Sequence, residues 1–176
     1  MNKPVIYQLL PRLFRNCNDH CVPDGTTEQN GSGKLADISD KVLASLRDMG
    51  ITHVWLTGVI EHAQKTDYSA YGIRRDNPYV VKGRAGSPYA IKDYYDVDPD
   101  IAVSVPDRML EFEATVQRVH DAGMKVILDF VPNHVARQYH SDARAADAPS
   151  DFGAYDDTTK FFSPRNNFYY IPNQRF

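Results

Sequence analysis

The sequence has 176 residues, of which 42% are hydrophobic and 24% are charged, and its formal net charge is −3 at neutral pH. This composition is typical of a globular protein, and it excludes a disordered chain and a strongly basic nucleic-acid-binding domain. Since no apolar run reaches the roughly 20 residues of a membrane-spanning helix, we expect neither a membrane nor a nucleic-acid partner.

The first apolar segment, residues 5–10, predicts a strand. Pro11 and Arg12 follow it, where a secretory signal peptide would carry small residues before its cleavage site. We therefore predict a cytoplasmic protein. Residues 15–33 are polar, rich in Gly, Asn and Asp, and without a repeating period, so they predict a loop.

Two cysteines, Cys17 and Cys21, lie in this predicted loop, with Asp19 and His20 between them. Zinc sites normally take four ligands from two spaced pairs, and the sequence offers no second pair of cysteines. A disulfide is not expected in the reducing cytoplasm. We predict two unpaired loop thiols.

A helix is predicted over residues 35–49, where apolar side chains recur at helical spacing. The members of this apolar face are Leu35, Ile38, Val42, Leu46 and Met49. Asp37 or Ser39 can cap the start of the helix, and Gly50 can end it in a left-handed conformation. Residues 51–56 then predict a second buried strand.

The next segment, residues 59–99, contains scattered Gly, Pro and Asp and predicts a long connection, a length that usually indicates function. A second helix is predicted to start near Pro106, a favoured first helical residue, and to end at Gly123. Its predicted buried stripe consists of Met109, Phe112, Val116 and Val119.

The strongest functional signal lies in residues 125–134. An apolar start predicts a third strand buried on both faces, and Pro132 stops it. Asp129 is then placed at the strand end, with Asn133 and His134 just beyond. A carboxylate is costly to bury without a partner, so this placement suits a site at the carboxyl ends of parallel strands. Taken alone, such an Asp and His more often form a hydrogen-bonded pair that fixes a loop.

Strands and helices alternate from residue 5 to residue 128, and this alternation predicts parallel strands joined by right-handed crossovers. Residues 136–176 show no such periodicity. The aromatic run 168–170 in this tail is interpreted as structural, with a place in a substrate cleft as the alternative.

The spacing Asp-x-x-x-Asn-His at residues 129–134 resembles the first signature region of the α-amylase superfamily of glycoside hydrolases, at the end of the third barrel strand. Residues 5–14, 33–57 and 87–99 are also similar to that superfamily. The chain departs from its pattern where Gly58 replaces a proline after the second strand.

Two further departures concern positions that bind sugar or calcium in members of the superfamily. Pro88 replaces the glycine often found before the sugar-stacking tyrosine, and Lys34 stands where some members carry an acidic calcium ligand.

The resemblance implies the α/β class and an incomplete (β/α)8 TIM barrel. Residues 1–135 would form the amino-terminal part of the barrel, with the first three βα units. Residues 136–176 would begin the excursion domain, domain B, that follows the third strand. A complete barrel needs roughly 250 residues, so we expect uncovered strand edges and exposed apolar faces.

Members of the superfamily cleave or transfer α-glucosidic bonds with retention, using two carboxyl groups that flank the bond. In the superfamily these two groups and a third carboxylate, which holds the sugar hydroxyls, follow the fourth, fifth and seventh strands, so the resemblance places no catalytic residue in this chain. We therefore predict an amino-terminal fragment of a retaining α-glucan hydrolase, of α-amylase or α-glucosidase type, that is inactive alone.

Three alternatives stay open at this point. The chain could belong to a transglycosylase or isomerase of the same superfamily, or to a non-catalytic relative that binds glucan or a protein partner. An unrelated nucleotide-binding α/β domain is disfavoured, because the sequence lacks a Gly-x-Gly-x-x-Gly turn.

The resemblance also assigns binding roles. His134 would hydrogen-bond hydroxyls of an α-glucan or maltooligosaccharide, since neutral imidazole both donates and accepts. Tyr89 would stack on the sugar, with a loop-core aromatic as the alternative. Asp129 and Asn133 would support the site. Asn133 is also a candidate calcium ligand, but one amide supplies few of the six to eight oxygens that calcium takes, so we predict no required cofactor.

Overall fold

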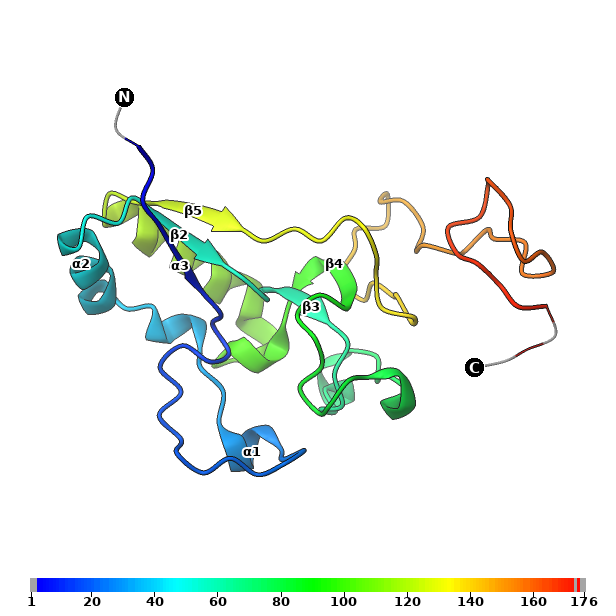
Figure 1. Cartoon of the computed structure of the whole chain (residues 1–176), viewed down its shortest axis with the longest axis horizontal. Helices are drawn as coiled ribbons and strands as arrows, with labels where there is room; N and C mark the ends of the chain where they lie inside the picture. The colour runs from blue at the N-terminus through cyan, green and yellow to red at the C-terminus, as the bar shows by residue number, and fades with distance from the viewer. Residues whose placement is uncertain (1–2, 173, 175–176) are drawn as a thin grey trace.

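A three-stranded parallel sheet organises the chain (Figure 1). The computed structural model describes residues 3–172 and 174. The sheet has the order β1 (Ile6–Leu9), β2 (His53–Leu56), β5 (Lys125–Leu128), with both pairings parallel. The predicted parallel strands are confirmed, and β2 lies in the centre.

Two helices, α2 (Asp40–Asp48) and α3 (Arg108–Asp121), pack on this sheet. Their buried side chains share one core with the fully buried Val54 and Leu56 of β2. The alternate residues of β2, His53 and Trp55, are only partly buried. The helices thus cover one face of the sheet, and the described residues leave the other face partly open.

The first predicted helix is interrupted. Residues 35–37 form a 3-10 turn, and α2 begins after Ser39 as its N-terminal cap. Arg118 of α3 donates to the backbone carbonyls of Leu35 and Ile38, at 3.0 and 3.2 Å, and so takes two acceptors that a continuous helix would use. The break therefore follows from a tertiary contact that the local pattern does not contain.

The expectation that the third strand is buried on both faces is wrong for the described chain. Both ends of β5 are exposed and its centre is only half-buried, because β5 is an edge strand. Leu128 is 40% exposed and Ile6, in the opposite edge strand, is 47% exposed. These side chains are the exposed apolar surface that a partial barrel was expected to leave.

The long connection between β2 and α3 contains a second sheet that the sequence did not reveal. β3 (Ile60–His62) pairs antiparallel with β4 (Ile91–Val97), with irregular register at each step. In Figure 1 the pair continues from the carboxyl end of β2 toward the tail. Charged residues are buried within both strands, so neither shows an apolar alternation.

The remaining segments are short turns and irregular chain. The predicted loop at residues 15–33 contains one helical turn, α1 (Thr27–Asn30), and carries Cys17 and Cys21 as exposed, unbridged thiols. Described residues of the tail from 136 onward form turns and bends without a helix or strand. None of the helices in the described part of the chain has the length and apolar character needed to cross a membrane.

Candidate functional site

The segment after β5 leaves the sheet at its carboxyl edge. The backbone N–H of Asp129 donates to the carbonyl of Leu56 at 3.1 Å, so Asp129 lies level with the end of β2. Asn133 and His134 lie in the loop beyond and are exposed, and Nδ1 of His134 lies 3.0 Å from Oδ1 of Asn133. The structure thus places these three residues at the carboxyl end of a parallel strand, as the sequence predicted.

Two contacts with β4 hold this loop. The hydroxyl of Tyr94 donates to the carbonyl of Val131, and the N–H of Ala136 donates to the carbonyl of Ile91 at 2.7 Å. Tyr89 stands two residues before Ile91 and is 46% exposed. The second contact therefore brings the backbone near Tyr89 to the loop that carries His134.

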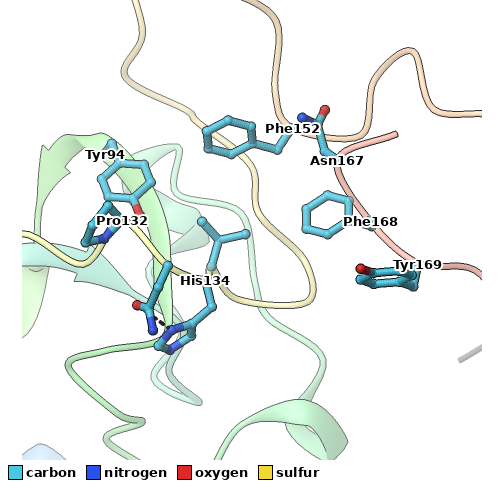
Figure 2. Close-up of a pocket in the computed structure, with 9 residues that line it drawn as sticks. Tyr94, Pro132, His134, Phe152, Asn167, Phe168 and Tyr169 are labelled. Atoms are coloured by element: carbon cyan, nitrogen blue, oxygen red, sulfur yellow. Dashed lines mark hydrogen bonds between the residues drawn. The ribbon is translucent and has the colours of Figure 1, made fainter. Parts of the chain in front are cut away.

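An open cleft of about 360 Å³ lies between this loop and the tail (Figure 2). Its lining includes Tyr94, His134, Phe152, Asn167, Phe168 and Tyr169. Aromatic faces beside an imidazole and an amide are the surfaces that bind the apolar faces and hydroxyls of a sugar ring. Of the predicted site residues, His134 and Asn133 line the cleft; Tyr89 and Asp129 do not.

Five cleft residues were not singled out as site residues from the sequence: Tyr94, Pro132, Val135, Phe152 and Asn167. Phe168 and Tyr169 of the aromatic run 168–170 line the cleft, and a role of this run toward substrate stays a prediction. No local signal identifies Tyr94, because it reaches the cleft only through the pairing of β3 with β4.

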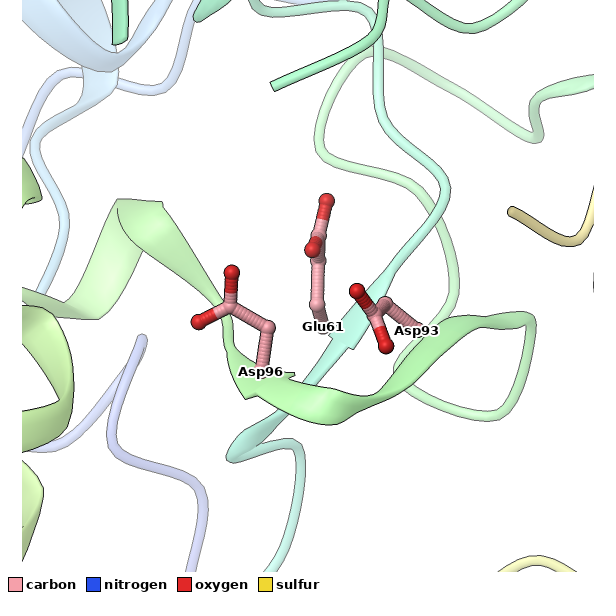
Figure 3. A group of neighbouring side chains, drawn as sticks. All are labelled: Glu61, Asp93 and Asp96. Atoms are coloured by element: carbon pink, nitrogen blue, oxygen red, sulfur yellow. The ribbon is translucent and has the colours of Figure 1, made fainter. Parts of the chain in front are cut away.

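A buried acidic cluster lies on β3 and β4, outside the cleft (Figure 3). Glu61, Asp93 and Asp96 have carboxylate oxygens within 4.8 Å of one another. Lys92 lies 3.3 Å from Glu61 and Arg108 forms an ion pair with Asp96, so two cations already face the cluster.

The oxygens of Asp93 accept backbone N–H groups of Tyr95, Asp142 and Ala143. By contrast, the buried Oε2 of Glu61 has no partner among the described residues. Burial raises the pKa of Glu61 to about 8; Lys92 opposes this shift, and the charges of Asp96 and Asp93 add to it. Glu61 is therefore expected to keep a proton at neutral pH.

This proton makes a pH dependence testable. The ordinary pKa of glutamate is 4.5 and that of folded Glu61 is about 8, so between these values the folded chain holds more of the proton than the unfolded chain. The stabilisation that this proton gives the folded chain is complete below pH 4.5. It is lost as the pH rises through about 8, by up to about 1.4 kcal/mol per pH unit.

The measurement is urea unfolding between about pH 6.5 and 8. Wild-type stability is expected to fall with pH, whereas Glu61→Gln flattens the slope because glutamine does not titrate. Glu113→Gln, at an exposed position of α3, is the control and should keep the wild-type slope. Equal slopes for all three chains would contradict a proton on Glu61.

The sequence offered Asn133 as a candidate calcium ligand, and the structure shows which oxygens surround it. Asn133 offers one amide oxygen, which already faces His134, and the described acidic group with metal-ligand spacing consists of Glu61, Asp93 and Asp96 and does not include Asn133. The described residues therefore do not complete a calcium site around Asn133, and calcium binding there stays a prediction.

Comparison with known proteins gives consistent matches. A family model described as "Alpha amylase, catalytic domain" matches residues 8–174. Maltase A1 of Drosophila melanogaster is 28% identical over 142 residues, which is 81% of this chain and 18% of that protein. Trehalose-6-phosphate hydrolase of Bacillus subtilis is 29% identical over 137 residues, covering 78% of this chain and 18% of that protein.

A relative of another kind is the amino acid transporter heavy chain of Homo sapiens, which is 28% identical over 76% of this chain and 14% of its own length. Among solved structures, the alpha-amylase of Lactobacillus plantarum superposes with a TM-score of 0.51 at 26% identity, covering 77% of this chain and 24% of that one. The chain spans less than a fifth of the length of these curated relatives. By the match of the catalytic-domain model to nearly its whole length, the chain belongs to the α-amylase family.

Proposed function

We propose that this chain is the amino-terminal part of a retaining α-glucan hydrolase and supplies one wall of its sugar-binding site. The observation that carries the proposal is the open aromatic cleft with His134 on its edge, beside the carboxyl end of a parallel strand. Relatives named maltase, alpha-amylase and trehalose-6-phosphate hydrolase support an α-glucoside as the substrate class.

Each predicted residue has a role in this proposal. The exposed imidazole of His134 donates to and accepts from sugar hydroxyls, and Tyr89 offers an exposed ring for stacking. Asn133 orients His134 through the 3.0 Å contact. Asp129 supports the site from the strand end. Calcium is not required for any of these roles.

The bond-breaking groups come from elsewhere in the proposed enzyme. Retaining hydrolysis needs a carboxylate that attacks the sugar carbon and a carboxylic acid that protonates the leaving oxygen and later activates water. The acid needs a pKa raised toward neutrality. Glu61 has a raised pKa, but its side chain is buried and does not line the cleft, so we assign it no part in the chemistry.

Two other functions compete with hydrolysis. A transglycosylase or isomerase would use the same wall, and it would differ by excluding water from the covalent intermediate. A non-catalytic relative is the second candidate, and the similarity to an amino acid transporter heavy chain favours it. It would lack the two carboxyl groups after the later strands.

The proposal predicts that the purified chain has no turnover. On a chromogenic α-glucoside the rate should equal the buffer blank, because neither carboxyl group of the mechanism is present. In NMR spectra, maltotriose should shift the imidazole resonances of His134 and leave those of the distant His20 unchanged. Measurable turnover would refute the predicted inactivity, and an unshifted His134 would refute its place in the sugar site.

A further inference from the structure

One side chain, Tyr94, joins three segments that meet at the cleft. Its ring lies 5.5 Å from that of Phe130, 5.9 Å from that of Tyr139 and 6.3 Å from that of Phe152, measured between centroids. Its hydroxyl donates to the carbonyl of Val131. Tyr94 therefore contacts the segment after β5 and two parts of the tail at once.

The loop that carries His134 depends on few other contacts. Its far end is held where the N–H of Ala136 donates to Ile91. Within the described part of the chain, no backbone–backbone hydrogen bond involves residues 132–135, which lie between the two anchors. The position of His134 is therefore set mainly by the anchors at Val131 and Ala136.

The two anchors differ in whether a side-chain substitution can remove them. The contact between Ala136 and Ile91 joins backbone atoms, so it tolerates most substitutions. The contact at Val131 depends on the hydroxyl of Tyr94. Val131 also packs in a small core with Ile60 and Ile91, so the anchor is continuous with β3 and β4.

We infer that Tyr94 is a positioning residue for His134: its hydroxyl fixes the start of the 131–136 loop, and its ring forms one wall of the cleft that has His134 on its edge. The role of His134 toward a sugar rests on the proposed function, whereas the control of the loop by Tyr94 does not. Figure 2 shows Tyr94 and His134 on the same side of the cleft, opposite Phe168 and Tyr169.

The test compares Tyr94→Phe with Tyr95→Phe. The first substitution removes the hydroxyl and keeps the ring, so the aromatic contacts stay and the carbonyl of Val131 loses its partner. The second removes a hydroxyl from the adjacent, exposed residue of the same strand and is the matched control.

Three measurements are expected to separate the variants. Hydrogen exchange at the amide of Ala136, whose N–H donates to Ile91, should become faster in Tyr94→Phe and stay unchanged in Tyr95→Phe. The imidazole resonances of His134 should move in Tyr94→Phe alone. The affinity for maltotriose should fall roughly tenfold, because a misplaced imidazole loses its hydrogen bonds to the sugar.

The outcomes keep the two proposals apart. If the wild-type chain does not bind maltotriose, the proposed sugar site fails in this chain, and exchange and the His134 resonances still decide the role of Tyr94. Unchanged exchange and unchanged resonances in Tyr94→Phe would overturn that role. So would a Tyr94→Phe chain that no longer folds, since it would make the hydroxyl a general structural contact.

Discussion

Replacing Lys92 with methionine is expected to destabilise the folded chain by about 3–5 kcal/mol. Lys92 is 3% exposed and its ammonium lies 3.3 Å from Glu61 and 3.6 Å from Asp76, whose side chains are equally buried. It also donates to the carbonyl of Arg74. Methionine keeps the length of the side chain and removes the charge, so the two carboxylates lose their shared cation.

Urea unfolding followed by circular dichroism at about pH 8 measures this effect, because Glu61 then carries more of its charge. Lys82→Met, at an exposed position in the same connection, is the control and should change stability by less than about 0.5 kcal/mol. The double variant Lys92→Met with Glu61→Gln should recover part of the loss. A Lys92→Met chain as stable as the control would show that the ion pairs contribute nothing.

The sequence predicted the parallel sheet well because its signal is local. The strand at residues 53–56 alternates buried and half-buried side chains, and Gly50 and Gly123 adopt the positive φ of 84° and 79° that lets a helix end before a strand. The placement of Asp129 and His134 followed from the end of such a strand. These features can be predicted from a few residues that are adjacent in the sequence.

The second sheet could not be predicted from local pattern. Residues 91–97 of β4 include the buried charges Lys92, Asp93 and Asp96, so the strand has no apolar face. Their burial depends on partners far along the chain, such as Glu61 and Arg108. Long-range pairing of this kind outweighs the local preference for loop.

The cleft was missed in part for the same reason. Tyr94 enters it from β4, and Phe152 enters it from a tail without regular structure. Tyr89 shows the converse: its sequence context resembles that of a sugar-stacking tyrosine, yet the described cleft does not include it. Its contact with sugar therefore stays a prediction.

The second large effect is expected for His134→Ala in the proposed complete enzyme. The specificity constant kcat/KM for a maltooligosaccharide should fall roughly 100-fold, equivalent to about 2.7 kcal/mol of transition-state stabilisation. The reason is that hydrogen bonds to the sugar hydroxyls strengthen as the ring distorts toward the transition state. Because His134 is exposed, its removal should leave the melting temperature unchanged.

Two further variants make the result specific. His134→Gln should recover part of the activity, since an amide also donates and accepts hydrogen bonds. His20→Ala, in the exposed loop after β1, should leave kcat/KM at the wild-type value. If His134→Ala behaved like His20→Ala, the imidazole would make no contact with the sugar, and the pair Asn133–His134 would serve only to fix the loop.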